Sequence, residues 1–162
     1  MFHVKYSAMN FEEIWYRGGS ALRLGAKASR DQWGVWLELA GALPGHEHAI
    51  PAAGGQKYDW AHKLAFRLSR LDLGKLGWAL QRAEAGELVT LVHRYQGRSK
   101  RLQLVRAANG VVFVNGEGSG TAPRIAVPLD GEGAWRFGEC LRVAYHAALQ
   151  RTAFVPDDGG EG

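Results

Sequence analysis

The segment 57–80, KYDWAHKLAFRLSRLDLGKLGWAL, constrains the fold most because a strand pattern runs directly into a helix pattern. From Tyr58 to Ser69 aromatic or apolar residues alternate with other residues, which predicts a strand with one face that packs. Ser69 and Asp72 then have the spacing of a capping box at a helix N-terminus. We therefore expect a strand that ends at Ser69 and a helix that follows at once. The packing face of that strand would carry Tyr58, Trp60, His62, Leu64, Phe66 and Leu68.

Alternating patterns on both sides of this helix predict further strands. They cover residues 20–28, 33–39, 87–95, 100–106, 111–115 and 124–129, with turns at 29–32, 96–99 and 107–110. Residues 41–56 are predicted to form a long loop, and residues 116–121 a flexible one. A second helix begins after Asp130, and its apolar residues recur at intervals of three and four.

The two strand-to-helix junctions resemble each other, since RLSRLD at 67–72 is echoed by AVPLDG at 126–131. This indicates two repeats, each of about four strands and one helix. Runs of strands followed by a helix favour antiparallel sheets, so we predict an α+β fold with two packed sheets. Residues 1–154 would form a single domain, and residues 155–162 a flexible acidic tail.

Composition narrows the class of protein. The chain of 162 residues is 46% hydrophobic and 22% charged, which is typical of a soluble globular domain. Its longest apolar runs fall short of the roughly 20 residues that span a membrane, and its N-terminus resembles neither a signal nor a transit peptide. We therefore expect a cytoplasmic protein without a membrane partner. The one cysteine, Cys140, excludes an intramolecular disulfide and is predicted to be a buried, inert thiol.

Charge suggests a polyanionic partner. The formal net charge is +4, although three acidic residues and no basic one lie within the last six positions, so the rest of the chain is more basic than the whole. A mildly basic soluble protein without such a partner is the alternative reading. The acidic tail itself is either solvated or a contact for a partner protein.

Aromatic and basic residues recur together, a combination that suits single-stranded nucleic acid because unpaired bases stack on rings and phosphates need cations. Trp33, Phe66 and Phe113 are predicted to be core residues instead. No predicted helix carries the row of side chains that reads a major groove. The predicted stacking residues are Trp15, Tyr16, Trp36, Tyr58, Trp60 and Tyr95, and the predicted phosphate contacts are Arg17, Lys27, Lys57, Lys63, Arg94, Arg98, Lys100 and Arg101.

Motifs of catalysis are absent from the sequence, which has no G-x-S-x-G elbow, phosphate-binding loop or H-E-x-x-H helix. His46 and His48 lack a third ligand for a metal. On a strand, the side chains of Asp59 and His62 would point to opposite faces and could not act as a pair. We therefore predict a protein that is not an enzyme and that holds no cofactor or metal.

The segment 58–80, YDWAHKLAFRLSRLDLGKLGWAL, which we call the central segment, resembles a segment of the Whirly family of single-stranded-DNA-binding proteins. A second stretch, WYRGGSALRL at 15–24, resembles that family's Tyr-Lys-Gly-Lys-Ala-Ala-Leu strand and turn, with Arg17, Gly19 and Ser20 as departures. The family associates the lysine replaced by Gly19 with assembly beyond the tetramer, so such assembly is not implied here. The matching residues of the central segment are Tyr58, Asp59, Trp60, Lys63, Phe66, Leu68, Ser69, Asp72 and Gly74.

The resemblance implies two antiparallel sheets with packed helices, a homotetramer built through those helices, and single strands that run along sheet edges between subunits. Kinetoplastid guide-RNA-binding proteins are similar in fold, so RNA is an alternative ligand. The domain begins near the N-terminus, which is more typical of a bacterial, phage or mobile-element protein than of an organellar one.

Our leading hypothesis is an oligomeric protein that binds single-stranded DNA independently of sequence during replication, recombination or transfer. An RNA-binding or RNA-annealing protein with the same surfaces is the second hypothesis. The third is a structural protein–protein module in which every aromatic residue belongs to the core.

Overall fold

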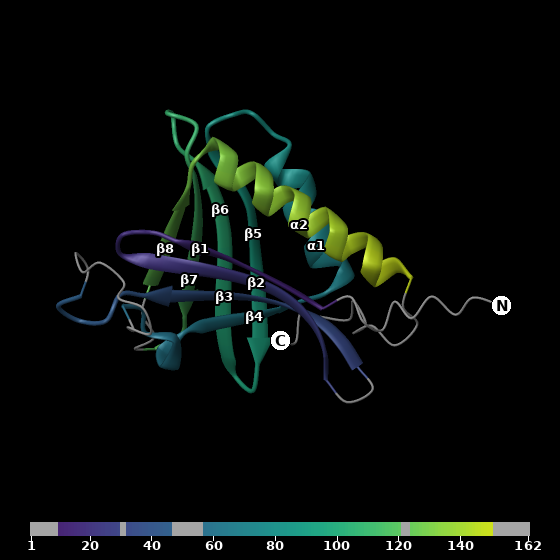
Figure 1. The fold of residues 1–162 in the computed structure, drawn as a ribbon, viewed down its shortest axis with the longest axis horizontal. Coiled ribbons are helices and arrows are strands. Elements are labelled where there is room, and N and C mark those ends of the chain that lie inside the picture. The colour runs from purple at the N-terminus through teal and green to yellow at the C-terminus, as the bar shows by residue number, and fades with distance from the viewer. Residues whose placement is uncertain (1–9, 30–31, 47–56, 121–123, 151–162) are drawn as a thin grey trace.

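The computed structural model describes residues 10–29, 32–46, 57–120 and 124–150, which form two antiparallel four-stranded sheets, each followed by a helix (Figure 1). The strand orders are β1-β2-β3-β4 and β5-β6-β7-β8. The predicted α+β fold with two repeats is confirmed. The elements are β1 Phe11–Tyr16, β2 Ser20–Ser29, β3 Gln32–Gly41, η2 Trp60–His62, β4 Leu64–Leu68, α1 Arg70–Leu80, β5 Gly86–Tyr95, β6 Arg98–Arg106, β7 Val112–Gly118, β8 Arg124–Leu129 and α2 Gly131–Leu149.

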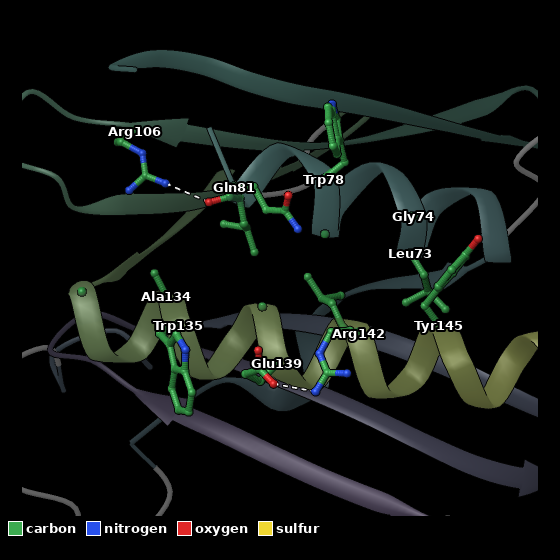
Figure 2. A pocket seen from close by; sticks show the side chains of 15 residues that line it. Leu73, Gly74, Trp78, Gln81, Arg106, Ala134, Trp135, Glu139, Arg142 and Tyr145 are labelled. Carbon is green, nitrogen blue, oxygen red and sulfur yellow. Dashed lines mark hydrogen bonds and ion pairs between the residues drawn. The ribbon is translucent and has the colours of Figure 1, made fainter. Parts of the chain in front are cut away.

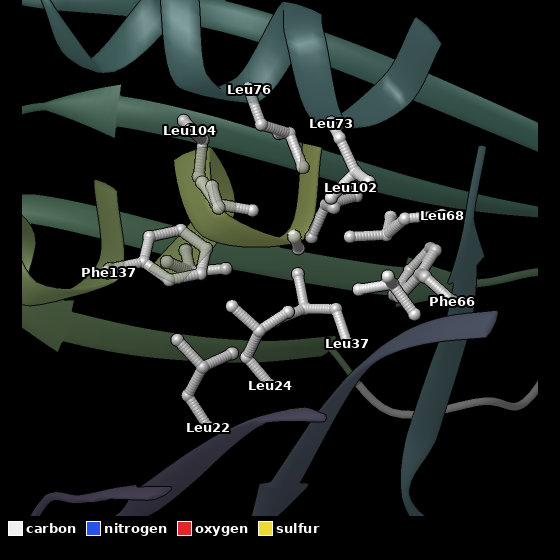
Figure 3. Close-up of a cluster of buried hydrophobic side chains, with 14 of the residues drawn as sticks. Leu22, Leu24, Leu37, Phe66, Leu68, Leu73, Leu76, Leu102, Leu104 and Phe137 are labelled. Carbon is white, nitrogen blue, oxygen red and sulfur yellow. The ribbon is translucent and has the colours of Figure 1, made fainter. Parts of the chain in front are cut away.

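The core lies between the two sheets and beneath the helices. In Figure 1 the strands of the second sheet cross those of the first, and α1 and α2 lie side by side across one end. Inner positions of both sheets and of both helices meet there, because alternate residues of each strand point the same way. The fully buried side chains include Leu22, Leu24, Leu37, Phe66, Leu68, Leu73, Leu76, Leu102, Leu104 and Phe137 (Figure 3).

Local capping explains where each helix begins. Ser69 Oγ accepts a hydrogen bond from the Asp72 backbone N–H at 3.0 Å, and the Asp72 carboxylate accepts one from the Ser69 N–H at 3.0 Å. The predicted capping box is therefore confirmed. Asp130 caps α2 with a single bond, because its Oδ1 accepts from the Gly133 N–H at 2.7 Å, while Gly133 has no side chain to bond back. Among the described helices, none is long and apolar enough to cross a membrane.

The strand predicted from Tyr58 to Ser69 is wrong over its first half. Pairing between β3 and β4 begins at Leu64, and Tyr58 forms only an isolated bridge with Ala42. Between them the chain turns through η2, since without a continuous partner strand its backbone bonds locally. This turn brings His62 Nδ1 to 3.0 Å from Asp59 Oδ2, so these two side chains do not point to opposite faces as predicted.

Residues 116–118, predicted as part of a loop, belong to β7. Gly116 lies at a close approach of the two sheets, since a Cβ there would come within 3.1 Å of the Leu64 side chain and 3.2 Å of the Leu39 side chain. The glycine therefore serves sheet packing and not loop flexibility. Most of the predicted loop 41–56 and the whole predicted tail 155–162 lie outside the described residues.

The two repeats match on their outer faces at the level of single residues. Arg23 on β2 lies directly opposite Glu38 on β3, with 2.7 Å between Nε and Oε1. Arg101 on β6 lies directly opposite Glu117 on β7, with 3.3 Å between Nη1 and Oε1. The second and third strands of each sheet thus share an Arg–Glu pair, which strengthens the inference of an internal repeat.

Candidate nucleic-acid interface

The outer face of the first sheet collects aromatic and basic side chains at positions that alternate with the core. Its cross-strand register places Arg23 opposite Glu38, and Gly25 opposite Trp36, which in turn lies opposite Arg67. We call this surface the first-sheet face. It comprises Glu12, Tyr16, Arg23, Gly25, Lys27, Gly34, Trp36, Glu38, Tyr58, Trp60, Lys63 and Arg67.

Trp36 lies near the middle of the first-sheet face and is half-buried. The Arg67 guanidinium carbon lies 5.5 Å from the centroid of its ring, in the range of a cation–π contact. On the other side its neighbour is Gly25, which has no side chain, and a cavity of about 290 Å³ opens there. The indole therefore offers a surface on which a planar ligand can stack.

A second group of rings lies toward the end of the first-sheet face. Trp60 packs beside the buried Tyr58, and the Arg23 guanidinium carbon lies 4.2 Å from the Trp60 ring centroid. Tyr16 is 54% exposed, and its ring lies 5.5 Å from that of Tyr58 with an interplanar angle of 30°. The rings of Trp36 and Trp60 thus each have an arginine packed against them.

Cations outnumber the carboxylate in the ion-pair network of the first-sheet face. Glu38 accepts from Arg23 Nε at 2.7 Å and from Lys63 Nζ at 2.5 Å. Burial alone would raise the pKa of Glu38, but these two cations outweigh burial and lower it, so the carboxylate stays ionised. Lys27 is exposed nearby, and with Arg67 it leaves the surface attractive to phosphates.

Three solved structures are similar to this chain in fold, each with a TM-score of 0.64 and 16% sequence identity. WHY1 from Arabidopsis thaliana matches 88% of this chain and 92% of its own, and WHY3 from the same plant matches 86% and 89%. PBF-2, described as a plant transcriptional regulator, matches 87% of this chain and 83% of its own. The chain has a Whirly-like fold. No model of a protein family matches the sequence, and no curated protein does.

Within the Whirly-like fold, two of the predicted stacking residues have no accessible ring. Trp15 is 1% exposed because it pairs with Leu22 on the inner face of the first sheet, where its ring meets Phe137 edge-on at 5.6 Å. Tyr58 is 5% exposed, and its hydroxyl donates to the Arg17 carbonyl at 2.5 Å. Trp15 is therefore a core residue, while Tyr58 supports the rings above it.

Besides Lys63 and Arg101, which pair with Glu38 and Glu117, three predicted phosphate contacts are engaged within the protein. Arg17 Nε donates to the Pro128 carbonyl at 2.8 Å, which ties β1 to the second sheet. Lys57 is 8% exposed and lies 5.8 Å from the Tyr58 ring centroid. Lys100 is half-buried, donates to the Ala65 carbonyl, and has a pKa lowered by burial. Lys100 thus covers a carbonyl of the edge strand β4, a common protection of sheet edges.

The other predicted site residues on the second sheet remain exposed. Arg94 and Tyr95 end β5, Arg98 begins β6, and Arg101 forms the ion pair with Glu117 described above. The Whirly-like fold therefore divides the predicted site between the first-sheet face and the β5–β6 hairpin. The bond from Lys100 to Ala65 holds that hairpin against β4.

Sequence reasoning missed Arg23 and Arg67, the two cations that lie over Trp60 and Trp36. Each occupies a polar position of an alternating strand, which is the signal that could have indicated them. Of the predicted core residues, Trp33 and Phe66 are buried as expected and Phe113 is half-buried.

The remaining polar candidates form no further site among the described residues, where no cluster of three metal-binding side chains occurs. His46 is exposed, and His48 lies outside the described residues. Cys140 is half-buried against the core, and burial raises the pKa of its thiol. The low thiolate fraction fits the predicted inert cysteine.

A second surface is formed by the two helices. Figure 2 shows α1 and α2 side by side. Residues of both helices line a cavity of about 570 Å³. Trp78 on α1 is 71% exposed and Trp135 on α2 is 66% exposed. Both indoles line this cavity, and a contiguous exposed apolar surface of this kind is a feature of interaction sites.

Proposed function

We propose that the protein binds single-stranded nucleic acid on the first-sheet face, with a preference for DNA over RNA. The observation that carries this proposal is the pair Trp36 and Trp60, which share one cationic sheet surface and each have an arginine over the ring. Unpaired bases expose both faces for stacking, whereas the bases of a duplex do not. The Whirly-like fold of WHY1, WHY3 and PBF-2 supports the proposal.

In this proposal the phosphates of the nucleic acid lie along Lys27, Lys63 and Arg67. The bound nucleic acid then continues past the edge of β4 toward Arg98 and Tyr95 of the β5–β6 hairpin. Stacking accepts every base, so most positions of the strand bind independently of sequence. No reaction is assigned to the protein, which would protect or present single strands during replication, recombination or transfer.

Arg67→Ala should weaken binding of a single strand and also make it less dependent on salt. Each phosphate contact with a single strand contributes about −0.7 to the slope of log affinity against log salt concentration, so we expect a slope shallower by about that amount. Fluorescence anisotropy at several salt concentrations measures it.

Arg124→Ala is the matched control, since it removes an equal charge from the second sheet. Arg124 is ion-paired with Glu117 at 2.9 Å on that sheet. Equal slopes for Arg67→Ala and the wild type, or a larger change with Arg124→Ala, would place the phosphates elsewhere.

We further propose that the helical face joins copies of the chain into a homotetramer. Trp78→Lys with Trp135→Lys should give a smaller assembly, because burial of these indoles would stabilise the interface and a buried charge would oppose it. Sedimentation velocity measures the mass. Val92→Lys, an exposed apolar position on β5, is the control that should keep the wild-type mass. A monomeric wild type, or a double variant of unchanged mass, contradicts this proposal.

A further inference from the structure

The cavity beside Trp36 has the dimensions of a site for one base. Glu12 on β1, Gly25 on β2 and Trp36 on β3 lie in one cross-strand row. Adjacent strands are about 4.8 Å apart, so the backbones of β1 and β3 are separated by about 10 Å. A Cβ added at Gly25 would have as its nearest neighbour only the Phe11 carbonyl oxygen, at 3.6 Å. No side chain of β2 therefore fills the space between Glu12 and Trp36 in this row.

The walls of this cavity differ in chemistry. Trp36 supplies an aromatic surface, and Arg23 and Lys27 supply positive charge. Two carboxylates line it as well, and one of them, Glu38, already accepts from Arg23 and Lys63. Glu12 is exposed and has neither a hydrogen bond nor an ion pair with another residue in the described part of the chain. Its carboxylate is thus available to a ligand, as an acceptor only.

The bases differ in the number of donors that they offer to a carboxylate. Guanine presents N1–H and the N2 amino group side by side on its Watson–Crick edge, which matches the two oxygens of Glu12. Adenine and cytosine each place an acceptor nitrogen beside their amino group, and thymine and uracil flank one N–H with two carbonyls. These edges are free in a single strand.

We propose that Glu12 makes the cavity beside Trp36 selective for guanine, so that one position of the bound strand prefers that base. This inference rests on the proposed function, since it assigns a single base within a strand held on the first-sheet face. Stacking on Trp36 would hold the base, Arg23 and Lys27 would face its phosphate, and Glu12 would read its edge. The selectivity adds to binding that is otherwise tolerant of sequence.

The test compares oligothymidine with the same oligonucleotide carrying one central guanine, adenine or hypoxanthine, by fluorescence anisotropy at fixed salt. We expect the guanine strand to bind at least about fivefold more tightly than the other strands, as for a side chain that reads two groups of one base. Hypoxanthine lacks only the N2 amino group, and adenine is a purine that stacks as guanine does. Guanine and adenine strands of equal affinity would overturn the inference.

Two variants locate the effect. Glu12→Gln removes the acceptor-only carboxylate and should bring the ratio of guanine to adenine affinity close to one. The loss of a negative charge should at the same time strengthen binding of every strand. Gly25→Val fills the cavity with a residue that favours the β-strand conformation, and it should likewise bring this ratio close to one. A ratio unchanged in both variants contradicts the assignment. If no strand binds the wild type, the proposed function itself fails, whereas equal binding of all strands overturns guanine selection alone.

Discussion

Trp36→Ala combined with Trp60→Ala should lower the affinity for a single strand by about 30-fold or more. A stacked base contributes about 1 to 3 kcal/mol, and each 1.4 kcal/mol changes a dissociation constant about tenfold. Both indoles lie on the first-sheet face outside the main core, so the double variant should remain folded. Fluorescence anisotropy gives the affinity, and circular dichroism checks the fold.

Trp36→Phe combined with Trp60→Phe is the matched control, because it keeps an aromatic ring at each position. It should retain most of the affinity. The salt dependence of the alanine variant should equal that of the wild type, since no phosphate contact has been removed. A folded alanine variant with wild-type affinity would show that neither indole stacks on a base.

The second large effect concerns stability. Asp72→Ala should lower the free energy of unfolding at neutral pH by about 2 to 3 kcal/mol, as expected when a buried hydrogen-bonding partner is removed and the cap of a helix is lost with it. The Asp72 carboxylate closes the capping box of α1 and also lies 3.0 Å from Nε2 of His93, which is 2% exposed. Urea unfolding measures the loss. Ser69→Ala, which removes only the cap hydroxyl, should cost about 1 kcal/mol.

The same carboxylate gives the stability a defined pH dependence. Burial alone would raise the pKa of Asp72, but the hydrogen bonds from His93 and from the Ser69 backbone outweigh burial and lower it from its ordinary value of 3.8. A lowered carboxyl pKa stabilises the fold above the ordinary value, and this contribution is lost as the pH falls below it. Wild-type stability should therefore fall more steeply in acid than that of Asp72→Ala, and parallel curves would contradict this role.

The features of the fold that depend on local chemistry could be predicted from the sequence. The capping box at Ser69 and Asp72 involves residues three positions apart, and the alternation within β2 and β3 identifies their faces without any knowledge of partners. The turn at Trp60 could not be predicted in this way. The alternation continues through it, while β3 pairs with β4 only from Leu64 onward.

Predicting the site required knowledge of the sheet register. Trp15 and Tyr16 are neighbours and must lie on opposite faces of β1, but alternation alone does not tell which face is covered by the second sheet. Arg23 and Arg67 resemble ordinary solvated strand residues until the register brings them to Trp60 and Trp36. For the same reason the cavity at Gly25 becomes evident only once β1 and β3 are placed on either side of β2.

The most direct test of our account compares binding of single-stranded DNA, single-stranded RNA and duplex DNA of matched mixed sequence at one moderate salt concentration. Fluorescence anisotropy should show tighter binding of single-stranded DNA than of duplex, because only unpaired bases can stack on Trp36 and Trp60. Tighter binding of RNA would assign the same face to RNA. Duplex bound as tightly as the single strands, or no binding at all, would contradict the account, and the latter result would favour a structural module.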